Sequence, residues 1–175
     1  MTANSIRVVG PVHANTDHGS AITEQEILAT QQSWAEGLLQ VGRDYSAGGI
    51  TQATATADAL IQQVYGYNLG PVLFKPTLAN GESTFRLTHE GALSYFVGNN
   101  PNYQDNGFAL MGWERYEFNN AGVYINGDMA LTMAHAKFFN QQGEATLVEK
   151  TWGFKKDTAG QVRIILHHSS IPFAS

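Results

Sequence analysis

The sequence predicts a single α+β domain in which a curved antiparallel sheet wraps around N-terminal helices. Three observations support this fold class. Apolar residues recur at helical spacing in the first third of the chain, apolar and polar residues alternate between short turns in the second half, and the helices precede the strands. With 175 residues, 43% of them hydrophobic, the chain is long enough to form one domain with a substantial core.

The helical layer is predicted from capping and breaking signals. Thr23–Glu26 reads as a capping box, so the first helix should begin there, and we expect it to end at Gly42. A second helix is predicted over about 50–65. The pair Gly48-Gly49 separates it from the first.

The middle of the chain mixes short elements. A strand is predicted over 72–75, and a return strand over 83–87 follows the turn signal Asn80-Gly81. Thr88 is placed to cap a short helix that ends at Gly98.

The second half of the chain is predicted to be a meander. Short polar turns separate its apolar runs, and strands joined by short turns pair antiparallel. The strands are expected near 108–118, 122–125, 128–139, 145–155 and 161–170.

Composition excludes several classes of function. The net charge is −5 and lysine and arginine form no cluster, so nucleic acid is not an expected partner. The absence of cysteine excludes disulfides and thiolate chemistry. No apolar run reaches the ~18 residues of a membrane span. Residues 1–20 read as a polar, flexible arm without a signal peptide, so we expect one domain over 21–175 and a cytoplasmic location.

The last predicted strand carries the most informative pattern. Because side chains alternate along a strand, Ile164, Leu166, His168 and Ser170 share one face, which should line an apolar pocket. The alternative for His168 is a core histidine bonded to a polar neighbour. His167 points to the opposite face, so the two histidines cannot bind one metal ion, and we expect neither a metal site nor another cofactor.

Two further hydroxyl groups lie in suggestive places. Tyr95 falls among apolar residues of the short helix, where its ring can fill the core while its hydroxyl reaches a polar partner. Thr77 follows Pro76 at the end of a strand. Taken alone, Tyr95 is better explained as an ordinary core residue and Thr77 as an ordinary turn residue.

Several motifs together resemble a known family. The ending His167-His168-Ser169-Ser170-Ile171-Pro172 is similar to that of NTF2-like domains of the CaM-kinase-II association-domain type. With the runs Leu73-Phe74-Lys75-Pro76-Thr77, Phe85-Arg86 and Glu90-Gly91-Ala92-Leu93-Ser94-Tyr95-Phe96-Val97-Gly98, the chain resembles the iota-class carbonic anhydrases over about residues 23–173.

This resemblance implies a specific structure and activity. It implies an NTF2-like cone, a homodimer, and reversible hydration of CO2 to bicarbonate and a proton without a metal. It also implies a catalytic site formed by Thr77, Tyr95, His168 and Ser170. In such a site the hydroxyls would orient a water molecule and hold the bicarbonate oxygens, and His168 would accept the proton.

Two alternatives remain open at the level of sequence. One is a different enzyme on the same cone that uses a buried carboxylate as base. The candidate carboxylates are Glu114, Glu117 and Glu149. The other is a non-catalytic domain that binds a ligand or oligomerises through the rear face of its sheet. The apolar residues expected on that face are Phe138, Trp152, Phe154 and Ile165.

Overall fold

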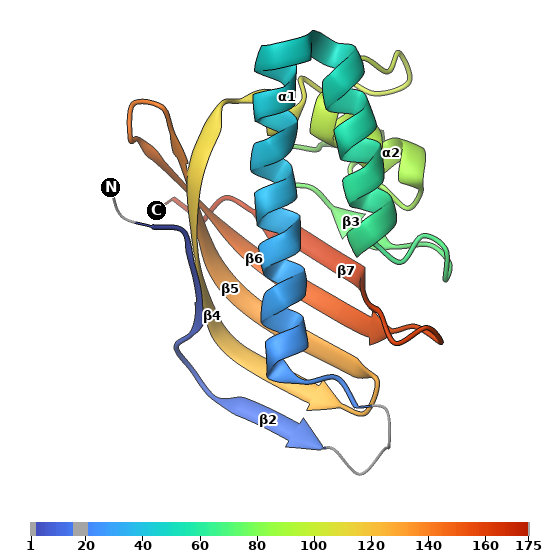
Figure 1. Cartoon of the computed structure of the whole chain (residues 1–175), viewed down its shortest axis with the longest axis vertical. Helices are drawn as coiled ribbons and strands as arrows, with labels where there is room; N and C mark the ends of the chain where they lie inside the picture. Colours follow the sequence, from blue (N-terminus) through green and yellow to red (C-terminus); the bar gives the residue numbers. More distant parts are fainter. Residues whose placement is uncertain (1–2, 16–20, 175) are drawn as a thin grey trace.

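A computed structural model describes residues 3–15 and 21–174, which form a curved sheet packed against a long helical hairpin (Figure 1). The elements in chain order are β1 (Ser5–Val8), β2 (Val12–Asn15), α1 (Glu24–Val64), β3 (Leu73–Lys75), the 3-10 turn η1 (Gly81–Ser83), α2 (His89–Val97), the 3-10 turn η2 (Phe108–Leu110), β4 (Trp113–Asn126), β5 (Met129–Asn140), β6 (Ala145–Lys156) and β7 (Val162–Ser170).

Two of the three signals predicted for the helical layer are confirmed. Thr23 caps α1 through the expected capping box with Glu26, and Gly49, at φ 71°, breaks α1 so that its second arm returns beside the first (Figure 1). The predicted end at Gly42 is wrong. A Cβ atom at Gly42 would lie 2.9 Å from the carbonyl oxygen of Ala109, so this glycine permits close packing against η2 instead of ending the helix.

The sheet is mixed, which corrects the prediction that it is wholly antiparallel. Its order is β1-β4-β5-β6-β7-β3, with β2 also beside β4. The meander β4 to β7 is antiparallel as predicted, but β1 and β2 run parallel to β4, and β3 runs parallel to β7. These parallel edge strands are joined to their partners by long connections. Their pairing therefore could not be predicted from a short turn in the sequence.

Three local predictions also need correction. The strands predicted over 108–118 and 122–125 are one strand, β4, with an irregularity between Asn120 and Gly122, after the 3-10 turn η2. No strand forms over 83–87, where a single backbone hydrogen bond joins Arg86 to Phe74 at 2.7 Å. The arm predicted to be flexible contains β1 and β2, although its residues 1–2 and 16–20 lie outside the described part of the chain.

The core is strongly aromatic and lies between α1 and the inner face of the sheet. Trp34 of α1 contacts Phe118, Phe138 and Trp152 with ring centroids 5.5 to 6.2 Å apart. Phe138, Trp152 and Phe154 are therefore core residues. The alternative of an oligomerising domain, which placed these three residues on the rear face of the sheet, is wrong on this point. None of the helices in the described residues is long and apolar enough to cross a membrane.

Candidate functional site

A β-bulge in β7 decides which of its side chains face the interior. Gly153 of β6 pairs with Leu166 and Phe154 pairs with Ile164, so Ile165 is an extra residue on β7. At Gly153 a Cβ atom would lie 2.9 Å from the Cβ of Leu166, so glycine is what lets the two strands approach here.

The bulge reverses the predicted orientation of the strand end. His167 and Ser169 are each 1% exposed and face the core, whereas His168 is exposed and Ser170 is half-buried. The prediction that His168 and Ser170 face an inner pocket is therefore wrong. Simple alternation held as far as Ile164, and the inserted residue then shifted it by one position.

Thr77 meets the inner serine across two neighbouring strands. Because β3 pairs with β7 and aligns Lys75 with His168, the residues just after β3 lie beside the end of β7. The Thr77 Oγ1 and Ser169 Oγ atoms are 2.6 Å apart. The Lys75 Nζ also donates a hydrogen bond to the carbonyl oxygen of Ser169 at 3.0 Å, which fixes this junction.

Tyr95 borders the same junction from α2. Its ring stacks on Phe108 with centroids 5.5 Å apart, and its hydroxyl is buried without a well-formed hydrogen bond among the described residues. Burial raises the pKa of Tyr95 to about 12, although the nearby Thr77 hydroxyl opposes that rise. Tyr95 therefore offers a neutral hydroxyl that still needs a partner.

His167 lies in a box of aromatic rings. It stacks on Phe74 at 4.8 Å and meets Trp34 and Trp152 edge-on at 5.3 Å each. Its Nδ1 atom is 2.7 Å from the hydroxyl of Tyr65. Burial holds the pKa of His167 well below its ordinary value, so its imidazole is neutral at neutral pH.

Lys150 also belongs to this cluster, although no sequence motif pointed to it. Its Nζ lies 2.9 Å from His167 Nε2 and 3.4 Å from Ser169 Oγ, and its side chain is buried. The signal was present, because Lys150 interrupts the inward apolar register that includes Val148 and Trp152.

The other candidate chemistries find no support in the interior. Glu114 and Glu149 are exposed, and Glu117 is half-buried in an ion pair with Arg115, so none of the three is a buried base. Within residues 3–15 and 21–174, no three side chains of histidine, aspartate or glutamate converge as metal ligands would.

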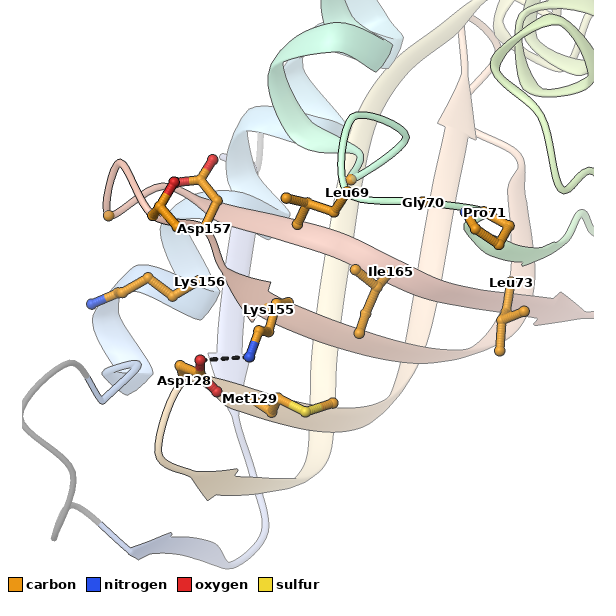
Figure 2. A pocket seen from close by; sticks show the side chains of 13 residues that line it. Leu69, Gly70, Pro71, Leu73, Asp128, Met129, Lys155, Lys156, Asp157 and Ile165 are labelled. Carbon is orange, nitrogen blue, oxygen red and sulfur yellow. Dashed lines mark hydrogen bonds and ion pairs between the residues drawn. The ribbon is translucent and has the colours of Figure 1, made fainter.

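A large hollow lies on the other side of the sheet. It measures ≈ 1000 Å³, and Figure 2 shows Leu73, Met129 and Ile165 projecting into it from the face opposite α1, next to the ion pair of Lys155 with Asp128. The cluster around His167 and Ser169 is therefore separate from this outer groove.

Comparison with known proteins gives consistent matches. The family model for metal-independent carbonic anhydrases matches residues 25–171. A metal-independent carbonic anhydrase from Nostoc sp. (strain PCC 7120) is 49% identical over 154 residues, which cover 87% of this chain and 75% of that protein.

Solved structures agree with the sequence matches. The iota-carbonic anhydrase from a cyanobacterium, complexed with bicarbonate, superposes with a TM-score of 0.88 at 47% identity and covers 92% of this chain and 99% of that one. An NTF2-like protein of unknown function from Pseudomonas putida KT2440 shares the fold, with a TM-score of 0.52 at 19% identity over 86% of this chain and 87% of that one. The predicted NTF2-like cone is confirmed, and the chain belongs to the metal-independent carbonic anhydrase family.

Proposed function

We propose that the inner cluster of Thr77, Tyr95, His167 and Ser169 is where this chain hydrates CO2 to bicarbonate and a proton. The observation that carries the proposal is a pair of hydroxyls 2.6 Å apart, on Thr77 and Ser169, beside the unpartnered buried hydroxyl of Tyr95. The bicarbonate complex of the cyanobacterial relative supports the same ligand for this chain.

The residue types suit both partners of the reaction. CO2 is apolar and is compatible with the surrounding aromatic rings, whereas bicarbonate presents oxygens that accept hydrogen bonds. The hydroxyls of Tyr95, Thr77 and Ser169 can orient the attacking water and then donate to the bicarbonate oxygens. This assignment replaces His168 and Ser170 with their inward neighbours and keeps Thr77 and Tyr95.

A reaction without a metal needs proton removal during the attack. Bulk water has a pKa of 15.7, against ≈ 7 when bound to zinc in carbonic anhydrase, so the nucleophile is not ionised beforehand. General-base catalysis contributes typically ~10²–10⁴-fold. We therefore expect turnover well below the ~10⁶ s⁻¹ of the zinc enzyme.

Stopped-flow CO2 hydration on metal-stripped protein tests the assignment. Tyr95→Phe should lower the rate ~10²–10³-fold, the loss typical for one hydrogen-bond donor to a developing anion, with the fold intact. Ser169→Ala should also lower the rate, and Ser170→Ala is the matched control. Near-normal rates for Tyr95→Phe and Ser169→Ala would refute the site, and activity restored only by added zinc or manganese would refute the metal-free reaction.

A second copy of this chain is the proposed partner of the outer sheet face. Met129, Leu131 and Met133 point outward at alternate positions of β5 and are 44%, 48% and 63% exposed, and Tyr124 of β4 is 50% exposed. Exposed apolar patches of this kind mark interaction sites, and a second copy presents the same apolar side chains. Light scattering should give the mass of a dimer, and Met133→Glu should give a monomer. A monomeric wild-type chain would contradict this.

A further inference from the structure

Lys150 places an amine in the core without a carboxylate to balance its charge. Its side chain is 4% exposed, and it takes part in none of the ion pairs formed among the described residues. Its Nζ lies instead over the Trp34 ring, 4.5 Å from the centroid, and 2.9 Å from His167 Nε2. A permanently charged ammonium in this position would be costly, because burial removes its hydration and no anion replaces it.

The direction of the hydrogen bonds around His167 favours a neutral amine. An indole N–H can only donate, and Trp34 Nε1 donates to the Tyr65 hydroxyl oxygen at 2.9 Å. The Tyr65 hydroxyl hydrogen is then free to donate to His167 Nδ1 at 2.7 Å. In this tautomer His167 carries its own hydrogen on Nε2 and donates it to Lys150 Nζ, which accepts only when its lone pair is free.

The opposite arrangement leaves a hydrogen without an acceptor. If a charged Lys150 donated to Nε2, the imidazole hydrogen would move to Nδ1 and point at the Tyr65 oxygen. The Tyr65 hydroxyl hydrogen would then have no acceptor among its two described partners, Trp34 and His167. Leaving a buried hydroxyl without an acceptor is destabilising, so the neutral amine is the better-bonded resting state.

We propose that Lys150 is the group that takes the proton released when water adds to CO2, an inference that rests on the proposed function. The water oxygen forms a bond to the CO2 carbon, one O–H bond of that water breaks, and its proton ends on Nζ. The products are bicarbonate and the Lys150 ammonium, which later releases its proton to solvent buffer. Ser169 links the amine to the site, with its Oγ 3.4 Å from Nζ and 2.6 Å from Thr77 Oγ1.

Aromatic rings around Lys150 Nζ stabilise its protonated form, while burial favours its neutral form. When Nζ takes a proton, the faces of Trp34, Phe138 and Trp152, at 4.5, 5.8 and 5.6 Å, stabilise the ammonium through cation–π interactions. Burial opposes that charge and lowers the pKa of Lys150 to about 7. A base whose pKa lies near the operating pH is the most effective.

The other titratable groups around Lys150 do not compete for the proton. From β7, His167 has its pKa lowered by burial, and His168 points away from the core. Tyr65, at the end of α1, and Tyr95 of α2 have their pKa values raised by burial and stay neutral. From β3, Lys75 donates to the carbonyl oxygen of Ser169 and is only half-buried.

A titration of the wild-type protein tests the amine directly. The sequence has five lysines, so protein made with lysine labelled with ¹³C at Cε gives few NMR signals. One signal, assigned by its absence in Lys150→Met, should titrate near pH 7, and kcat/KM for hydration should rise with pH about the same midpoint. A Lys150 pKa above about 9, close to the ordinary value, would overturn the proposal.

Variants separate proton transfer from a fixed charge. Lys150→Met should lower hydration ~10²–10⁴-fold and abolish the pH dependence near 7. Lys150→Arg keeps a positive charge that cannot be released and should lose as much, whereas Lys137→Met, at an exposed lysine of β5, should match wild type. Circular dichroism verifies folding, and if Lys150→Met does not fold, the wild-type titration decides, with the Lys150 signal assigned by its absence in Lys150→Arg.

The outcomes distinguish this inference from the proposed function. Metal-stripped wild type without hydration activity would overturn both. Active wild type with a folded Lys150→Met or Lys150→Arg of near-normal rate would overturn the role of Lys150 alone, and the site assignment would stand.

Discussion

Two buried basic side chains among the described residues, Arg86 and Lys150, are held in opposite ways. Arg86 is 3% exposed and donates to both carboxylate oxygens of Asp105, at 2.6 and 2.9 Å, while Ser94 donates to the same carboxylate at 2.6 Å. Lys150 is 4% exposed and has aromatic rings and His167 around it. The difference separates a charge neutralised to hold a loop against α2 from an amine whose protonation is free to change.

The largest effect on stability is expected when the carboxylate of Asp105 is removed from Arg86. Asp105→Ala leaves a permanently charged guanidinium buried and unpaired, so we expect a loss of ~3–5 kcal/mol in the free energy of unfolding. Urea denaturation measures it. Asp58→Ala, which removes a half-exposed pair with His89, is the control and should cost less than ~1 kcal/mol. Equal losses in the two variants would contradict the comparison.

The pH dependence of stability should sharpen the contrast. The pKa of Lys150 is lowered to about 7 in the folded protein, so between that pH and its ordinary value near 10.5 the unfolded chain binds the extra proton. Stability should therefore rise with pH from 7 to 9, by at most ~1.4 kcal/mol per pH unit, and the penalty is fully present below pH 7.

The control for this linkage is Lys150→Met over the same range. Because other groups titrate alike in both proteins, the difference between their urea-unfolding curves isolates Lys150. A difference that does not change between pH 7 and 9 would mean that the amine stays charged in the fold.

The smallest effect should come from the outward histidine. His168→Ala removes an exposed side chain and should change stability by less than ~0.5 kcal/mol and hydration by less than about twofold. His167→Ala removes the acceptor for Tyr65 and the donor to Lys150, so it should impair both properties. If His168→Ala impaired stability and hydration while His167→Ala did not, the first prediction, with His168 facing the interior, would be correct.

Sequence patterns predicted the parts of this fold that depend on local chemistry. The capping box at Thr23, the helix from Thr88 to Gly98 and the antiparallel meander all follow from short-range rules. The parallel edge strands depend on pairing between distant segments, which leaves no mark at short range.

The surroundings of the proposed site followed from the sequence only in part. Thr77 comes shortly after β3 and Tyr95 lies within α2, two elements that the sequence predicted. The inward faces of β7 depend on one inserted residue opposite Gly153, and an apolar run such as Ile164-Ile165-Leu166 does not reveal where it bulges. Lys150 was visible as a charge in an inward register, but its role emerges only from its contacts.

The bulge at Ile165 also bears on how this protein tolerates insertions and deletions. Since a histidine is followed two positions later by a serine in both settings of the strand end, a slip of one residue upstream would exchange neighbours of identical chemistry. If the end of β7 shifted by one residue, the repeated pair would therefore still present an imidazole and a hydroxyl to the interior.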